Sequence, residues 1–166
     1  MNTKRGQENV MGALRLISTR SKVPVSMSTK EGRIRIQKLV YLLKAGGYTP
    51  ARDFAFNLYV NGPYSPELAK VYYSTGDAGL KSIPPATDLP GPLLTTVVEA
   101  NAHGIAFLEA LTTTIDLVTS LRTNRASGAT SAGLVWARSI KPHIKAEVWR
   151  EVEEFLQTHK ELAGST

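Results

Sequence analysis

The sequence contains no cysteine among its 166 residues. This absence excludes disulfide bonds, thiolate nucleophiles and zinc sites built on sulfur, and it fits a reducing compartment. The first residues, 1–9, are polar and lack the apolar core of a signal peptide. No apolar run approaches the roughly 20 residues that a membrane-spanning helix needs. From these absences we expect a cytoplasmic protein that makes no membrane contact.

Residue patterns for catalysis and metal binding are also missing. The histidines His103, His143 and His159 do not form an H-E-x-x-H arrangement, and no glycine-rich phosphate loop follows a predicted strand. The hydroxyl groups of residues 127–131 have no assignable base beside them. We therefore expect a protein that binds a partner and is not an enzyme, with no cofactor and no metal.

The chain does have a globular composition and an uneven distribution of positive charge. Hydrophobic residues make up 42% and charged residues 20%, which predicts a buried core, and the length fits a single helical domain over 1–166. The net charge is +6, yet residues 1–52 carry eleven Lys or Arg against two acids, whereas residues 53–121 carry two against seven. The basic third either faces an anionic partner or is neutralised by the acidic middle of the chain.

Hydrophobic periodicity predicts a mainly α (α+β) domain with one short β element. We expect helices over residues 10–19, 30–45, 66–76, 93–121 with a break at Gly104, 134–140 and 143–162, and a strand over 54–60. The helix over 30–45 is the best defined, because Ser28 or Thr29 can cap its start and Gly46 can end it. Residues 61–63 are predicted to be a turn, and residues 124–133 a loop of small side chains.

Two ordered motifs lie in residues 35–73. The first is the run Ile36-Gln37-Lys38-Leu39-Val40-Tyr41-Leu42-Leu43, and the second is Phe56-x-x-Tyr59 followed by Gly62-Pro63-Tyr64-Ser65-Pro66-Glu67-Leu68. Together they resemble the YwgA-like family of small prokaryotic proteins. A more distant likeness is to the Panacea domain of SocA-type antitoxins, which has a similar helix and a Gly-Pro turn. The resemblance covers about a quarter of the chain.

The resemblance implies a mainly helical regulatory or interaction domain of winged-helix-like type with no established enzymatic activity. In the antitoxin relatives the domain binds and neutralises a partner protein. The partner-binding residues expected from the motifs are Gln37, Lys38, Tyr59, Gly62, Pro63, Tyr64 and Ser65.

The motif residues also have a physical interpretation of their own. Lys38 lies within an apolar helix, where a lysine tolerates burial only if its ammonium group is paired or reaches water. Gln37 can hydrogen-bond the turn at Gly62, and Tyr59 and Tyr64 can flank that contact. Two interpretations stay open: a structural tie between helix and turn, or a shallow aromatic and basic pocket that grips a peptide or nucleic acid.

For function we expect a regulatory binding protein, with DNA as the first candidate ligand. Phosphate contacts are expected from Lys4, Arg5, Arg15, Arg20, Lys22, Lys30, Arg33 and Arg35. Of these, Arg15, Arg20, Lys22 and Arg33 are expected to be surface-exposed. The first two helices resemble a helix–turn–helix pair, although the second is too apolar to lie freely in a groove. The alternative is an antitoxin or adaptor that neutralises or regulates a partner protein.

Overall fold

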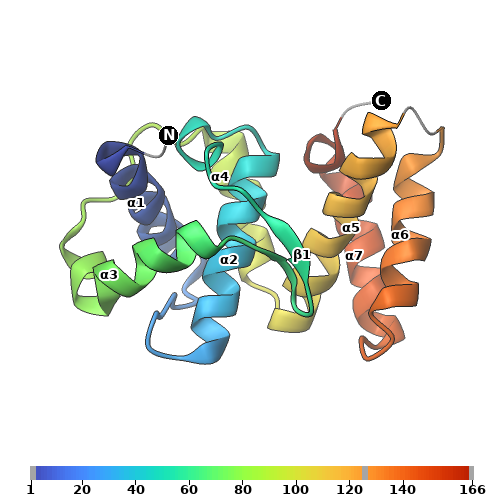
Figure 1. Cartoon of the computed structure of the whole chain (residues 1–166), viewed down its shortest axis with the longest axis horizontal. Coiled ribbons are helices and arrows are strands. Elements are labelled where there is room, and N and C mark those ends of the chain that lie inside the picture. Colours follow the sequence, from blue (N-terminus) through green and yellow to red (C-terminus); the bar gives the residue numbers. More distant parts are fainter. Residues whose placement is uncertain (1–2, 125–126, 165–166) are drawn as a thin grey trace.

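The computed structural model describes residues 3–124 and 127–164, which form helices and one β-hairpin (Figure 1). The helices are α1 (Lys4–Ser21), α2 (Lys30–Ala45), α3 (Pro66–Ser82), α4 (Gly91–Asn101), α5 (Ile105–Thr123), α6 (Ala129–Ile140) and α7 (Ala146–Thr158), with 3-10 turns η1 (Thr49–Ala51) and η2 (Lys160–Ala163). Strands β1 (Asn57–Tyr59) and β2 (Gly62–Tyr64) pair antiparallel. The prediction of a mainly helical fold with a short β element is confirmed.

Helix α2 is enclosed on nearly all sides. The Thr29 side chain caps its start by accepting a hydrogen bond from the Gly32 N–H, and the helix ends at Gly46, both as predicted. Every residue of the run 36–43 is buried, because α2 contacts α1, α4, α5, η1 and β2. Residues 36–43 therefore cannot lie in a DNA groove, and the exposed residues of α2, Lys30 and Glu31, lie in its first turn.

The β-hairpin differs in detail from the prediction. Its first strand spans three residues rather than 54–60, and Gly62 and Pro63 belong to β2 rather than to the turn. The turn itself consists of Val60 and Asn61, and Tyr59 pairs with Gly62. Gly62 has a φ of +86°, a conformation that glycine adopts without a steric cost. The hairpin is thus shorter and tighter than its hydrophobic pattern indicates.

Four helices also differ from their predicted limits. Helix α1 starts at Lys4, where Thr3 caps it, and α3 continues through a kink at Gly76 as far as Ser82. The last predicted helix is confined to α7 and the separate turn η2. Helix α6 begins inside the predicted loop 124–133, of which residues 125–126 lie outside the described residues.

Small side chains in the first half of α6 allow that helix to lie very close to α5. A Cβ atom on Gly133 would stand 2.4 Å from the Val118 side chain. The run of small residues therefore reflects close packing between two helices, which a local pattern does not distinguish from a loop.

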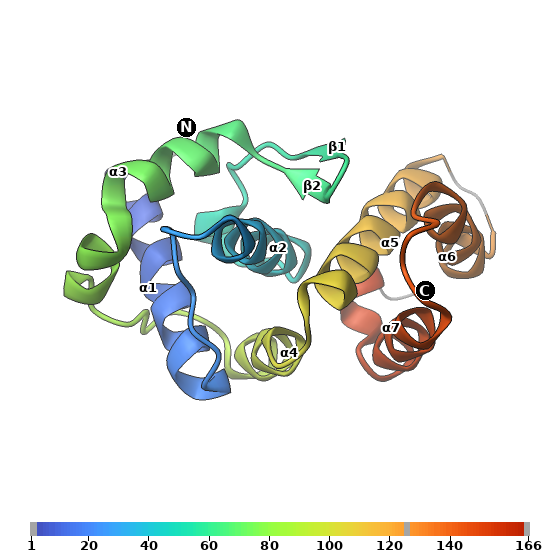
Figure 2. The same ribbon diagram turned by 90° about the horizontal axis from the view of Figure 1, so that it is seen from below.

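The helices are arranged in two groups with the hairpin between them (Figures 1 and 2). Helices α1 to α4 lie on one side, and α5, α6 and α7 lie on the other. Helix α5 joins the groups, because it contacts α2 and β2 as well as α6 and α7. Throughout residues 3–124 and 127–164, each helix is too short or too polar to cross a membrane.

Candidate binding site

A pocket of about 350 Å³ opens between α2, α3 and the hairpin. Its lining combines tyrosine rings with cationic side chains. We call it the tyrosine pocket, and it is lined by Lys30, Arg33, Ile34, Gln37, Lys38, Tyr59, Val60, Asn61, Gly62, Tyr64, Tyr72 and Tyr73. It brings residues of both motifs together with two of the basic residues that were expected to contact phosphate.

Two pairs of tyrosine rings line the pocket. Tyr59 and Tyr64 come from the hairpin, with ring centroids 5.5 Å apart at an interplanar angle of 72°. Tyr72 and Tyr73 come from α3, with centroids 4.9 Å apart. The outer ring of each pair is accessible, since Tyr59 is 52% and Tyr73 is 65% exposed. The guanidinium of Arg33 lies 5.7 Å from the centroid of the Tyr73 ring, a cation–π arrangement that keeps the two side chains together.

Gln37 ties α2 to the start of α3. Its Nε2 donates to the Ser65 carbonyl at 2.9 Å, and its Oε1 accepts from the Ser65 N–H at 2.8 Å. The expected partner of Gln37 was the Gly62-Pro63 turn, whereas the observed partner is Ser65, which follows that turn. Both groups are buried, and the paired bonds fix the two tyrosine-bearing elements to α2.

Lys38 has the most deeply buried cationic side chain of the pocket, with 1% exposure. Its Nζ donates to the Pro63 carbonyl at 2.8 Å, and within residues 3–124 and 127–164 it forms no ion pair with a carboxylate. Burial lowers the pKa of Lys38 to about 7, opposed by the negative charge of Glu109 and assisted by the positive charge of Lys141. A carbonyl thus supplies the partner that a buried lysine was predicted to need.

The hairpin approaches α2 and α5 so closely that only glycine fits at Gly62. A Cβ atom there would stand 2.9 Å from Thr113 Oγ1 and 3.3 Å from Lys38 Nζ. The Thr113 hydroxyl is buried and has no hydrogen-bond partner among the described residues. A positive φ and this close contact together account for the glycine.

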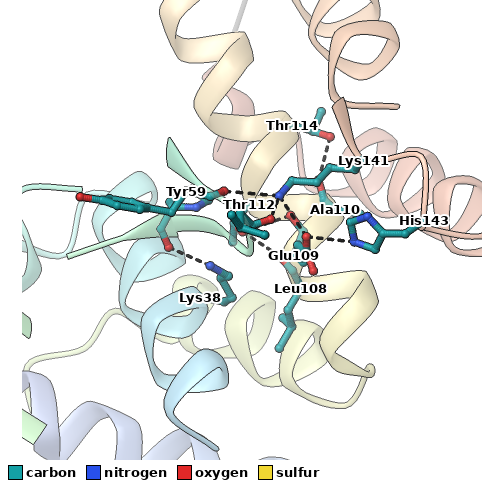
Figure 3. A network of polar contacts seen from close by, with 11 residues as sticks. Lys38, Tyr59, Leu108, Glu109, Ala110, Thr112, Thr114, Lys141 and His143 are labelled. Carbon is teal, nitrogen blue, oxygen red and sulfur yellow. Dashed lines mark hydrogen bonds and ion pairs between the residues drawn. The ribbon is translucent and has the colours of Figure 1, made fainter. Parts of the chain in front are cut away.

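A buried ion pair holds the tip of the hairpin from the opposite side (Figure 3). Lys141, at the end of α6, places its Nζ 3.0 Å from Glu109 Oε1 in α5 and also donates to the carbonyls of Tyr59 and Val60. The Nε2 of His143 lies 3.2 Å from the same Glu109 oxygen. Sequence patterns did not indicate this group, because its members come from segments that share no local motif.

The basic residues expected to contact DNA do not form one surface. Lys4 and Arg5 lie at the start of α1, whereas Arg20 and Lys22 lie at its end, roughly 22 Å away at 1.5 Å per residue. All four are exposed, as is Lys30. Of the predicted set, Lys30 and Arg33 are the members that line the tyrosine pocket.

Three of the predicted arginines donate hydrogen bonds to carbonyl groups within the fold. Arg35 donates to the Asn101 carbonyl at 2.9 Å and to the His103 carbonyl at 3.1 Å, and burial lowers its pKa. Arg15 and Arg33 were expected to be exposed but are half-buried. Arg15 donates to the Ile83 carbonyl, and Arg33 donates to the Met27 carbonyl at 3.1 Å. A carbonyl carries no net charge, so these three hydrogen bonds do not cancel the positive charge of the arginines that make them.

No family model, curated protein or solved structure matches this chain. The resemblance to YwgA-like and Panacea proteins therefore stays a prediction. The geometry of the tyrosine pocket is the basis for a proposal about function.

Proposed function

We propose that this protein is a regulatory binding protein that holds DNA through unpaired nucleotides in the tyrosine pocket. Bases stack on the accessible rings of Tyr59 and Tyr73, while Lys30 and Arg33 contact phosphate. The observation that supports this proposal is the presence of two accessible aromatic rings and two cationic side chains in one concave site. Sites for single-stranded nucleic acid combine these same features.

Unpaired nucleotides fit this site better than a duplex does. A base in a duplex has both faces covered by its neighbours, so it cannot stack on a tyrosine without first leaving the helix. Readout of a duplex would need an element that enters a groove, and α2 is buried along the run 36–43. We therefore expect single-stranded DNA to bind more tightly than duplex DNA of the same sequence.

The test is the affinity of labelled single-stranded DNA for matched pairs of variants, followed by fluorescence anisotropy. Tyr73→Ala removes an accessible ring from the pocket, and Trp136→Ala removes an accessible ring from α6, outside the pocket. Stacking of one base contributes about 1–3 kcal/mol, so Tyr73→Ala should weaken binding roughly fivefold or more. Trp136→Ala should leave the affinity unchanged. Equal losses in both variants, or no binding by the wild type, would contradict the proposal.

A partner protein is the second candidate, supported by an apolar face on α6. Val135, Trp136 and Ile140 are exposed large hydrophobic side chains on this one helix. Grouped apolar side chains on a surface are typical of protein contacts. On this alternative, changing Val135 and Ile140 to serine should abolish capture of the partner, while Tyr73→Ala should not. If the partner is a second copy of this chain, sedimentation of the purified wild type will show a dimer.

A further inference from the structure

The tyrosine pocket contains cations at two depths. Lys30 is exposed and Arg33 is half-buried, whereas Lys38 is almost completely buried and still contributes to the lining. A ligand group that touches Lys38 must therefore enter the pocket rather than pass across its opening. The chemistry around Lys38 indicates which group this is.

We propose that the tyrosine pocket takes a phosphate monoester, carried by the end of a nucleic-acid strand, and that this phosphate contacts the ammonium group of Lys38. The proposal rests on the proposed function of the pocket. An internal phosphodiester continues into a nucleoside on both sides, so it cannot reach a buried lysine without bringing both into the pocket. A terminal phosphate has nothing beyond it and carries a larger negative charge, about −1.5 to −2 at neutral pH.

The balance of charge around Lys38 supports an anionic ligand. Glu109 is the carboxylate of this region, and it is already 3.0 Å from Lys141 and 3.2 Å from His143. Lys38 has only the neutral Pro63 carbonyl as its hydrogen-bond acceptor among the described residues. Glu109 is thus paired with Lys141, and a bound phosphate would supply a negative charge directly beside Lys38.

A polar atom without a partner lies next to the same site. Thr113 Oγ1 is buried and makes no hydrogen bond among the described residues. It and Lys38 Nζ both lie close to Gly62, within 2.9 Å and 3.3 Å of the position that a Cβ atom there would occupy. A buried hydroxyl without a partner is unusual, and this one lies beside the lysine although Thr113 itself does not line the pocket.

The site should take up a proton when phosphate binds. Because burial lowers the pKa of Lys38 to about 7, much of the free protein has a neutral amine above that pH. A phosphate beside the amine favours the ammonium form, so affinity should fall by up to about tenfold per pH unit above pH 7. The other ionisable groups facing this region are Lys30 and Arg33 from α2, Glu109, Lys141 and His143 from α5 and the α6–α7 connection, and the tyrosines of the pocket. His143 contacts the same Glu109 oxygen as Lys141, so His143→Gln is the control that removes a neighbouring group and keeps Lys38.

The experiment compares DNA strands of one sequence that end in a 5′-phosphate, a 3′-phosphate or hydroxyl groups only, by calorimetric titration at pH 7.0 and 8.5. A phosphorylated strand is expected to bind at least tenfold more tightly than the hydroxyl-ended strand at pH 7.0. That advantage should shrink at pH 8.5 in the wild type and in His143→Gln, and should disappear in Lys38→Met. Lys30→Ala should weaken all strands alike and keep the preference.

The outcomes separate this inference from the proposed function. Equal binding of phosphorylated and hydroxyl-ended strands overturns the phosphate contact but leaves DNA binding intact. A nucleoside monophosphate is titrated in the same way: if it binds while no strand does, the contact between phosphate and Lys38 stands, but the strand end as its carrier and the proposed function are overturned. If Lys38→Met does not fold, the inference is tested on the wild type. The number of protons taken up on binding is then measured at pH 8.5 in two buffers of different ionisation enthalpy. An absence of proton uptake in that measurement overturns the inference.

Discussion

At the scale of single residues, Lys38 is a cationic side chain whose burial is costly. An ammonium group loses its hydration when it is buried, and Lys38 recovers one hydrogen bond to Pro63 together with a more distant attraction to Glu109. The loss of hydration is the largest cause of its lowered pKa. Because burial changes the pKa of Lys38, the burial of this side chain can be tested through the pH dependence of stability.

The pKa of Lys38 predicts how stability depends on pH. Between pH 7 and pH 10 the unfolded chain keeps this lysine protonated, whereas the folded chain releases the proton, so this residue makes stability increase with pH. Lys38→Met removes that dependence while keeping a similar side-chain length. The free energy of unfolding of the variant, minus that of the wild type, should therefore decrease as the pH rises from 7 to 10. Urea unfolding measures it, and a difference that does not change with pH would contradict the burial of the amine.

Gly62 offers a second residue-scale test, with Gly47 as its control. Both have a φ of +86°, but a Cβ on Gly62 would clash with Thr113, whereas nothing lies within 4 Å of such an atom on Gly47. Gly47→Ala should cost about 1 kcal/mol, from backbone conformation alone. Gly62→Ala should cost roughly 1–3 kcal/mol more, because the clash with Thr113 adds to the same cost of a positive φ. Thermal or urea unfolding of the two variants compares them directly, and equal costs would show that the close contact is absent.

At the scale of elements, the sequence predicted what local chemistry determines. Thr29 starts α2 through a side-chain cap, and it was one of the two candidates, with Ser28, that the local sequence offered; Ser65 caps α3 in the same way. The start of α6 could not be identified locally, because its small residues fit against Val118 of another helix. Gln37 was predicted to bond the Gly62-Pro63 turn but bonds Ser65, because its partner depends on the exact register of the hairpin.

In the candidate site, too, features set by local sequence could be predicted, and contacts between distant segments could not. Its motif residues were identified because they follow one another along the chain, and the aromatic and basic pocket was one of two interpretations left open. The contribution of Tyr72 and Tyr73 was not predicted, although both lie in the helix that follows the second motif. The ion pair of Glu109 with Lys141 could not be predicted, because it forms only when α5 and the end of α6 come together.

That ion pair leads to the prediction at the element scale. Lys141→Ala would leave Glu109 buried without its nearest cation and would release the carbonyls of the hairpin tip. Loss of one partner of a buried pair costs about 3–5 kcal/mol. The control is Arg138→Ala, which removes an exposed pair with Glu153 at 3.6 Å and should cost under about 1 kcal/mol. Similar, small losses in both variants would mean that the hairpin is not held from α6.

At the scale of the whole molecule, the positive charge is spread more widely than the sequence alone suggested. Arg15 and Arg35 belong to the packing of the fold, and the exposed cations of α1 lie at its two ends. Of the predicted basic set, Lys30 and Arg33 line the pocket that also contains the accessible rings of Tyr59 and Tyr73. A DNA-binding surface built on the whole basic third would differ from one centred on this pocket, and salt dependence distinguishes the two.

The most direct test of the account is a salt titration of the affinity for single-stranded DNA. Three proteins are compared: the wild type, Lys30→Ala with Arg33→Ala, and Arg20→Ala with Lys22→Ala, each double variant losing two positive charges. Every phosphate contact adds about 0.7 to the slope of log affinity against log salt for a single strand. We predict that the pocket variant loses roughly 1.4 units of slope, while the α1 variant keeps the slope of the wild type. Equal slopes in all three proteins, or a loss confined to the α1 variant, would contradict the claim that the tyrosine pocket holds nucleic acid.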